Sequence, residues 1–399
     1  MSPEPAGTES AAHASLSRRD FMRIGGLAAA SASIPGVVPG LAEASFFAPK
    51  FKTKHVVLVA LAGGVRSRET LLSPRNVPNL MRLGESGVVV PSVGVRNVGH
   101  YGALLSLFTG RFEVMGIREN DRGGDPTIFE YVRKHAGLPA SRVWLSASGG
   151  PQQVNLAYSL HGDYGAEYGA NLVSADGVFN AELKGLVSSL GRPQAPDEAE
   201  DALIAKLRAA VATDGPKLAG GLANDAETTR RVERLILDEL TGRGPEITGP
   251  AAGDVRAMRT AVNVLQVFRP ALLGIALTNA DVAHSSFNGY VDVIKRNDGE
   301  IGYLMRSIEA DPELRDTTTV IVLPEFGRDR DLNERNGLDH GDNSDELRRV
   351  ALFASGPDFK KGATVKRTIE SIDVCPTICH FFGVKPAHAE AKLARELFA

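Results

Sequence analysis

The stretch "KHVVLVALAGG" (residues 54–64) decides the fold class, because it is an unbroken apolar run that ends at a pair of glycines. Its β-branched residues and its glycine boundary are typical of a strand that is buried on both faces of a sheet. Comparable apolar runs follow at 88–93, 141–148, 271–277, 317–323 and 348–355. Strands of this kind require a layer of helices on each side of the sheet.

Helical patterns lie between these runs and supply the two layers. Gly110 and Gly137 follow the apolar patterns of 101–110 and 126–137, as glycines do at helix ends, and Pro126 stands at a helix start. Further helices are expected at 77–87, 290–310 and 371–383. The alternation of strands and helices predicts an α/β fold with a doubly wound, mostly parallel sheet and helices on both faces.

The middle of the chain, 196–268, has a different character. Two segments carry apolar residues on one helical stripe, Leu203, Ile204, Leu207 and Val211 in the first and Val232, Leu235, Ile236 and Leu240 in the second. Joints rich in Gly and Pro flank both segments. We expect a helical insertion or cap within one α/β domain of residues 45–399, not a separate domain.

Residues 1–44 have the features of an export signal. Arg18 and Arg19 precede a weakly apolar run at 24–41, and the small-residue pattern "AEA" follows at 42–44. The paired arginines and modest hydrophobicity indicate the twin-arginine (Tat) route. We therefore expect the Tat export machinery as a partner and a periplasmic or secreted protein. The alternative is an amphipathic or disordered N-terminus with a chance arginine pair.

Charge and hydropathy exclude some classes of partner. The chain has 45 Lys and Arg against 48 Asp and Glu, and without residues 1–44 the net charge is −2. This balance gives no reason to expect nucleic acid or an anionic membrane as a partner. No apolar stretch after residue 44 is long enough to be a transmembrane segment.

Two cysteines, Cys375 and Cys379, are spaced for one helical face, a geometry that suits a disulfide poorly. We expect them to pack as small apolar groups, with a metal pair as the alternative. The sequence also contains no G-x-G-x-x-G after its first strand and no G-K-[ST] loop. A dehydrogenase or a P-loop kinase therefore has little support.

Polar side chains gather where the predicted strands end. Asp281 and His284 follow the strand at 271–277, and Glu325 and Arg328 follow the strand at 317–323. His100 comes after the strand at 88–93, and Asp339 and His340 lie in the loop before the strand at 348–355. In an open doubly wound sheet, ligands bind beyond the carboxyl ends of the strands. Carboxylate and imidazole together form the ligand set of zinc, iron or manganese.

Each of these residues also has an ordinary structural interpretation. Asp281 and His284 are spaced for a solvated hydrogen-bonding pair, and Glu325 could pair with Arg328 on the surface. Asp339 and His340 could cap a turn, and His100 could be a satisfied histidine at a helix start. The coincidence at equivalent strand ends favours a metal site over these separate interpretations.

Several segments, in order, resemble the superfamily of alkaline phosphatases, sulfatases and nucleotide phosphodiesterases. The segments are "HVVLVALAGGVR", "VPNLMRLGESGVVVPSV", "LLSLFTGRFE", "DVAH", "LRDTTTVIVLPEFGRD", "FASGPDFKKG" and "SIDVCPTICHFFGV". Each motif is weak alone, and the ordered set covers most of 54–384. The resemblance implies an alkaline-phosphatase-like fold and a divalent metal, with zinc expected first and manganese or iron as alternatives.

The chain departs from that superfamily at three places. Ala62 and Gly63 stand where the resemblance implies a metal-binding Asp, and His100 stands where it implies a Thr, Ser or modified Cys nucleophile. Glu325 and Phe326 stand in place of an Asp-His pair. The resemblance therefore implies that the half of a two-metal site that activates the nucleophile is dismantled. The other half, Asp281, His284 and His340, is retained.

A subgroup of twin-arginine-exported, sulfatase-like proteins of unknown function carries an E-F-G-R…D-H pattern. The stretch "PEFGRDRDLNERNGLDHGDN" (residues 324–343) resembles it. That resemblance implies metal ligands at Asp281, His284, Glu325, Asp339 and His340. His100 is then a further ligand or a general base, and Arg328 stabilises a developing anion.

Two hypotheses follow from these residues. One is an exported metal-dependent hydrolase of small anionic phosphate or sulfate esters, without a Ser or Thr nucleophile. The alternative is a non-catalytic envelope protein that keeps the fold for binding or assembly.

Overall fold

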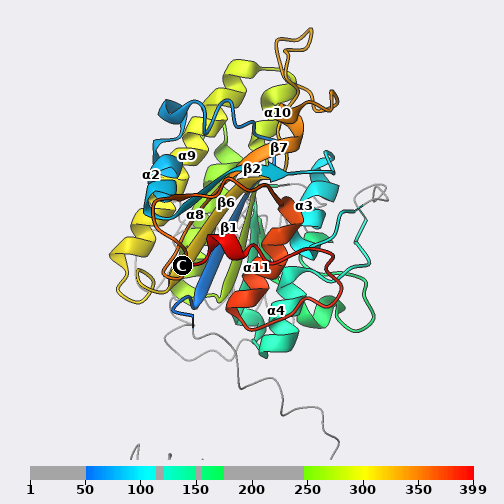
Figure 1. Ribbon diagram of the computed structural model, residues 1–399, viewed down its shortest axis with the longest axis vertical. Helices are drawn as coiled ribbons and strands as arrows, with labels where there is room; N and C mark the ends of the chain where they lie inside the picture. Colours follow the sequence, from blue (N-terminus) through cyan, green and yellow to red (C-terminus); the bar gives the residue numbers. More distant parts are fainter. Residues whose placement is uncertain (1–50, 114–120, 150–154, 175–246) are drawn as a thin grey trace, which may run out of the picture. The chain divides into compact units, whose positions relative to one another are not determined.

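The computed structural model describes residues 51–113, 121–149, 155–174 and 247–399, which all belong to the unit Pro49–Ala399 (Figure 1). Within these residues the strands form one nine-stranded sheet in the order β4-β3-β5-β1-β6-β7-β2-β8, with β9 beside β2. The strands are β1 (His55–Leu61), β2 (Val88–Gly94), β3 (Val143–Ala147), β4 (Asn171–Ser174), β5 (Leu272–Leu277), β6 (Thr318–Pro324), β7 (Arg349–Ser355), β8 (Ala363–Thr364) and β9 (Ile369–Glu370).

Strand direction decides which residues meet at each edge of the sheet. β4, β3, β5, β1 and β6 run parallel to one another, while β7 is antiparallel to both β6 and β2. β2 therefore runs in the same direction as β1, β5 and β6. The carboxyl ends of these four strands and the amino end of β7 consequently lie at one edge.

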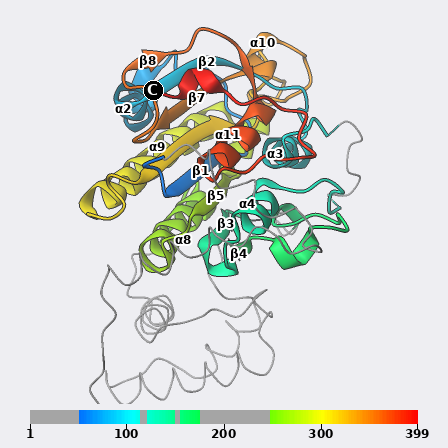
Figure 2. The same ribbon diagram turned by 60° about the horizontal axis from the view of Figure 1, so that its bottom comes forward.

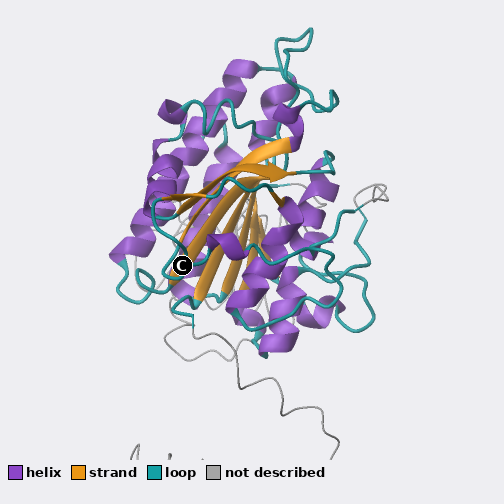
Figure 3. Ribbon diagram, viewed as in Figure 1, coloured by secondary structure: helices purple, strands orange, loops and turns teal. Residues whose placement is uncertain are grey.

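Two helical layers cover the sheet, as the continuous apolar strands require (Figures 2 and 3). The helices α2 (Pro78–Ser86), α8 (Ala252–Phe268) and α9 (Phe287–Ala310) bury one face in a cluster that includes Leu83, Met258 and Leu304. On the other face α3 (His100–Thr109), α4 (Ile128–Ala136) and α11 (Val374–Phe381) bury residues such as Phe108 and Phe129. The remaining α-helix of the described part, α10 (Asp345–Arg348), precedes β7.

The predicted doubly wound α/β fold is confirmed, and the helix ends show why the sequence predicted it. Gly110 and Gly137 adopt the left-handed conformation as helix caps, at φ 73° and 65°. Thr127 and Glu130 form a reciprocal capping box at the start of α4. Cys375 and Cys379 are free and buried in α11, as expected of small apolar groups.

The expected insertion at 196–268 overlaps the described residues only in part. Its last segment forms α8, which packs on β3 and β5 and is therefore part of the helical layer. The stripes at 203–211 and 232–240, and the export signal at 1–44, lie outside the described residues. No helix in the described ranges has the length and apolar character needed to cross a membrane.

His55 gives the sheet a testable pH dependence, far from the edge where the polar residues gather. It begins β1, is 2% exposed, and its Nδ1 lies 2.7 Å from the carbonyl oxygen of Pro270. Burial lowers the pKa of His55 below its ordinary value of 6.5, although the Pro270 contact opposes the shift. The unfolded chain therefore binds more protons than the folded chain at moderately acidic pH, and stability falls as pH drops below 6.5.

His55→Gln should flatten this part of the pH profile. Urea unfolding between about pH 8 and about pH 5 should show a smaller loss of stability in the variant than in the wild type. His161→Gln, which replaces a histidine in a loop outside the sheet, serves as the control. Parallel profiles for the wild type and His55→Gln would contradict a neutral, buried His55.

Candidate metal centre

Four chain segments meet at the edge formed by the carboxyl ends of the parallel strands. Asp281 and His284 lie in the short helix η6 (Asn279–His284) that follows β5, and Glu325 directly follows β6. His100 is the first residue of α3, six residues after β2 ends at Gly94. The loop 329–344, which carries Asp339 and His340, leads into α10 and β7. The residues that the sequence indicated as site candidates therefore lie at one edge, where ligands bind in open sheets of this kind.

Four side chains at this edge offer donor atoms to a common centre. One ligand atom from each of His100, Asp281, His284 and His340 lies within 4.8 Å of the other three. Three imidazoles and one carboxylate form a donor set that suits zinc, iron or manganese. The cluster is half-buried. The side chains of His100, His284 and Asp281 are 27%, 34% and 48% exposed.

His100 is held by the buried carboxylate of Glu325. Its Nδ1 lies 2.5 Å from Oε1 of Glu325, whose side chain is wholly buried. Its Nε2 faces the other way, 2.9 Å from Oδ1 of Asp281, but makes no well-aligned hydrogen bond within the described residues. A buried ring nitrogen that approaches a carboxylate without bonding to it has the geometry of two ligands converging on one point.

Burial and the neighbouring carboxylates shift the pKa values of both His100 and Glu325. Burial raises the pKa of Glu325 to about 7, against the opposing effect of His100. Burial alone would lower the pKa of His100, but the close approach of the Asp281 and Glu325 carboxylates outweighs it and raises the pKa to about 9. In the metal-free protein, the imidazole of His100 therefore lies between two carboxylates that favour its charged form.

His284 repeats the same arrangement with a second carboxylate. Its Nδ1 lies 2.5 Å from Oδ1 of Asp339, and Arg335 contacts the same oxygen at 3.1 Å. The Nδ1–H of His284 donates to this carboxylate, so Nε2 is left as an acceptor directed at the centre. Metal-binding histidines commonly carry such an outer carboxylate, which fixes the tautomer and the ring orientation.

His340 completes the cluster through ring contacts. Its ring packs edge-on against those of His100 and His284, with centroids 4.9 and 5.0 Å away, and also contacts Phe326. Burial lowers the pKa of His340 to about 4, and the positive charge of Arg328 adds to this effect. A neutral imidazole with free nitrogens is the form that binds a metal.

Arg328 is the buried cation of the site. Its side chain is 0% exposed, and its Nη2 donates to Oδ1 of Asp281 at 2.5 Å while Nη1 contacts Nε2 of His284 at 3.1 Å. The guanidinium also donates to the carbonyl oxygens of Gly63 and Leu338. Burial would raise the pKa of Asp281, but His100 and Arg328 together hold that pKa well below its ordinary value.

The glycine pair at the end of β1 makes room for this guanidinium. Gly64 has φ +66°, and a Cβ there would lie 2.8 Å from Nε of Arg328. At Gly63 a Cβ would lie 2.5 Å from the backbone nitrogen of Asp281. A side chain at either position would push away Arg328 or the backbone of Asp281. The two glycines therefore allow the backbone after β1 to approach these residues closely.

A buried network that the sequence did not reveal supports the helix η6. Asp254, which is 0% exposed in α8, accepts hydrogen bonds from the backbone of Asn279 and from Nδ2 of Asn297. Asn279 Oδ1 in turn accepts from the backbone of Asp254. On the other side, the backbone N–H of Leu338 donates to Ala283. The only sign of this network in the sequence is Asp254, an acidic residue in the first turn of α8. Acidic residues are common at that position in any helix, so the network could not be predicted from it.

The chain matches no protein family model and no curated protein. Among solved structures, wild-type alkaline phosphatase PafA is similar with a TM-score of 0.55 and 9% identity over 89% of this chain and all of that one. The chain therefore has the fold of this alkaline phosphatase. Murine ectonucleotide pyrophosphatase/phosphodiesterase 5, solved as an inactive form with AMP, is similar with a TM-score of 0.50 and 13% identity over 87% of this chain and all of that one.

Within this alkaline phosphatase fold, the geometry changes the roles that the sequence indicated for three residues. Glu325, expected as a ligand, lies behind His100, and Asp339, also expected as a ligand, lies behind His284. Arg328, expected to stabilise a developing anion, is fully buried and bonded to protein acceptors on every nitrogen. We therefore treat all three as positioning residues. The four side chains that could hold a metal are Asp281, His284 and His340, which were expected as ligands, and His100, which was expected as a further ligand or a general base.

Proposed function

We propose that the protein is an exported, metal-dependent hydrolase of small phosphate or sulfate esters, with a site for one metal ion. The observation that carries this proposal is the convergence of His100, Asp281, His284 and His340 at the carboxyl edge of the sheet. Two of the three histidines have a carboxylate on Nδ1, which turns Nε2 toward the other members of the cluster. This donor set fits zinc, and fits manganese or iron as alternatives.

A divalent ion at this centre would polarise an ester oxygen and increase the acidity of a bound water. Glu325 and Asp339 keep the rings of His100 and His284 in the orientation that the centre requires. Arg328 fixes Asp281 and balances part of the negative charge. These residues therefore preorganise the centre before any ligand arrives.

Water is the attacking group that the geometry favours. Within the described residues, no serine or threonine hydroxyl forms a hydrogen bond to any of the four cluster side chains. A covalent intermediate on such a hydroxyl therefore has no support. If Asp281, His284 and His340 alone hold the ion, Nε2 of a neutral His100 would accept the proton of an attacking water, and Glu325 would stabilise the imidazolium that forms.

Export rests on the sequence of residues 1–44. The paired arginines and the small-residue pattern support delivery by the Tat machinery to the periplasm or the exterior. We keep the sulfatase-like subgroup with the E-F-G-R…D-H pattern as part of this proposal.

One observation favours the alternative, a non-catalytic envelope protein used for binding or assembly. The guanidinium of Arg328 contacts two of the four donor side chains, Asp281 and His284, and so already neutralises part of the cluster. On this alternative the cluster is a network of ion pairs that needs no metal. Metal content separates the two proposals.

The purified, exported protein should contain about one equivalent of zinc, manganese or iron by elemental analysis. The double variant His284→Ala with His340→Ala should lose the metal together with any hydrolysis of p-nitrophenyl phosphate or p-nitrophenyl sulfate, because half of the donor set is removed. A folded wild type that stays metal-free after reconstitution would leave the non-catalytic alternative.

The control for this experiment is a second pair of neighbouring histidines. His161 and His388 stack with ring centroids 4.5 Å apart, outside the four-residue cluster. His161→Ala with His388→Ala changes the composition identically and should leave the metal content unchanged. Equal metal loss in both double variants would contradict the assigned centre.

A further inference from the structure

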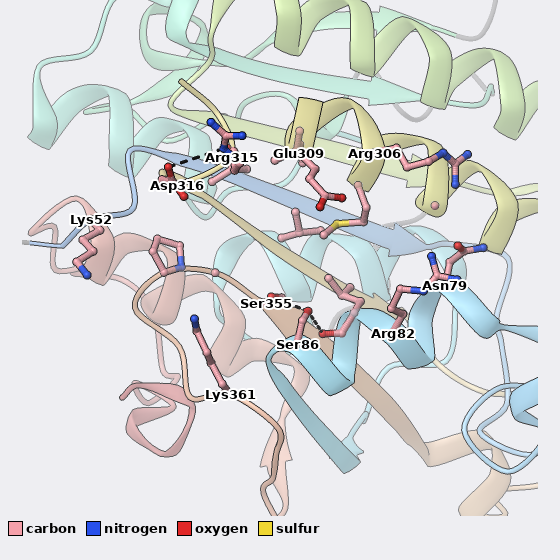
Figure 4. Close-up of a pocket in the computed structure, with 18 residues that line it drawn as sticks. Lys52, Asn79, Arg82, Ser86, Arg306, Glu309, Arg315, Asp316, Ser355 and Lys361 are labelled. Carbon is pink, nitrogen blue, oxygen red and sulfur yellow. Dashed lines mark hydrogen bonds and ion pairs between the residues drawn. The ribbon is translucent and has the colours of Figure 1, made fainter. Parts of the chain in front are cut away.

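A second cavity lies at the opposite edge of the sheet, at the amino ends of β1 and β6 (Figure 4). Its volume is about 780 Å³, which is in the range of small-molecule sites. The cavity lies between α2 and the second half of α9, and Lys52 and Lys361 close one end of it. β1 alone is seven residues long, so about 20 Å of strand separates this cavity from the candidate metal centre.

The floor of the cavity is apolar and fixed. Leu83, Ile308 and Val320 are at most 5% exposed and belong to the core cluster under α2 and α9. At one end α2 and α9 touch closely, since a Cβ at Gly302 would lie 2.5 Å from the side chain of Asn79. The wall between α2 and α9 is therefore built from packed helices, whereas Lys52 and Lys361 lie outside the helices and strands.

The rim is positively charged, in contrast to the chain as a whole. Five basic and two acidic side chains line the cavity: Lys52, Arg82, Arg306, Arg315, Lys361, Glu309 and Asp316. Asp316 lies 3.9 Å from Arg315, and no ion pair within the described residues involves Lys52, Arg82, Arg306 or Lys361. Positively charged side chains that surround a cavity and have no ion-pair partner among the described residues raise the local concentration of anions.

A buried hydroxyl in the same cavity lacks a partner. Thr318 opens β6 on the face that α9 covers, and is 5% exposed. Its Oγ1 is buried and makes no hydrogen bond to any described residue. Buried polar atoms normally have a partner, so the missing bond points to a ligand or water in the cavity.

We propose that this cavity is a second binding site, which takes a small molecule made of an oxyanion and a compact apolar body. The oxyanion is held by Arg82 or by Lys361, which lie on different sides of the rim (Figure 4), and the apolar body rests on Leu83, Ile308 and Val320. Arginine and lysine bind phosphate, sulfate and carboxylate through charge-assisted hydrogen bonds. The proposal is independent of the metal centre and of the activity proposed for it.

Isothermal titration calorimetry with phenylphosphonate, benzenesulfonate and benzoate tests the proposal and identifies the preferred oxyanion, since none of these probes is an ester that the metal centre could hydrolyse. We expect one equivalent of at least one probe to bind, and phenol and inorganic phosphate to bind more weakly. Arg82→Gln with Lys361→Gln should weaken binding roughly tenfold or more, because charge-assisted hydrogen bonds are lost. Glu309→Gln should strengthen binding, because it removes the unpaired negative charge at the rim.

The matched control is Lys295→Gln, which removes one charge from the exposed side of the same helix, α9, outside the cavity. It should leave the affinity unchanged. The proposal is overturned if no probe binds, or if Lys295→Gln weakens binding as much as the double variant. It is also overturned if His340→Ala abolishes binding while Arg82→Gln with Lys361→Gln leaves it intact, because the probe is then bound at the metal centre.

Discussion

Replacing Arg328 by methionine should lower the free energy of unfolding by about 3 kcal/mol in the metal-free protein. The side chain is 0% exposed, and methionine has a similar reach without any donor. The change leaves the carboxylate of Asp281 and the carbonyl oxygens of Gly63 and Leu338 without their cation. Because Asp281 is 48% exposed, the lower end of the range for a broken buried pair applies.

The cost should depend on metal. A bound divalent ion neutralises Asp281 directly, so the destabilisation by Arg328→Met should be smaller in the metal-loaded protein than with chelator. Urea unfolding in both conditions measures the difference. Arg328→Lys, which keeps the charge but lacks the planar fork, should fall between the methionine variant and the wild type.

Arg330→Gln is the control for these measurements. Its side chain is 56% exposed and pairs with Glu346 at the surface, so the free energy of unfolding should change by no more than about 0.5 kcal/mol. An Arg328→Met protein that is as stable as the Arg330→Gln protein would contradict the positioning role of Arg328.

Much of the fold could be predicted because its strands are apolar on both faces. The runs that became β1, β5 and β6 have no alternation that a surface strand would show, and the intervening helices end at Gly110 and Gly137. The antiparallel direction of β7 could not be predicted, since an apolar run has the same pattern in both directions. β8 and β9 are two residues long and give no periodic signal.

The sequence predicted the edge of the sheet at which the candidate centre lies, but not which side chains face it. The rule that ligands bind beyond the carboxyl ends of strands located the edge, whereas side-chain direction decides which residue faces the centre. Asp339 and His340 are neighbours in sequence, yet one lies behind His284 and the other packs among the donor rings. The glycines at 63 and 64 were the signal for a close approach by a buried side chain.

Replacing Glu325 by glutamine should weaken metal binding by about 10–100-fold, as is typical when the outer partner of a metal-binding histidine is lost. Glutamine keeps the shape of the side chain and an acceptor for Nδ1 of His100, but it lacks the charge that favours the Nδ1–H form of the ring. Competition against a chelating indicator measures the affinity of the wild type and the variant. Urea unfolding of the metal-free forms should agree to within about 1 kcal/mol, because the packing is unchanged.

Glu113→Gln is the matched control, because burial raises the pKa of Glu113 to about 7 just as it does for Glu325. Glu113 contacts Thr109 at the end of α3, away from the four donor side chains. Both variants therefore lose a carboxyl group whose pKa is raised by burial. Only Glu325→Gln changes a group that contacts His100. Equal metal affinity in the two variants would show that the orientation of His100 does not depend on Glu325. Weaker binding in Glu325→Gln alone would establish that the carboxylate acts through the ring that it holds.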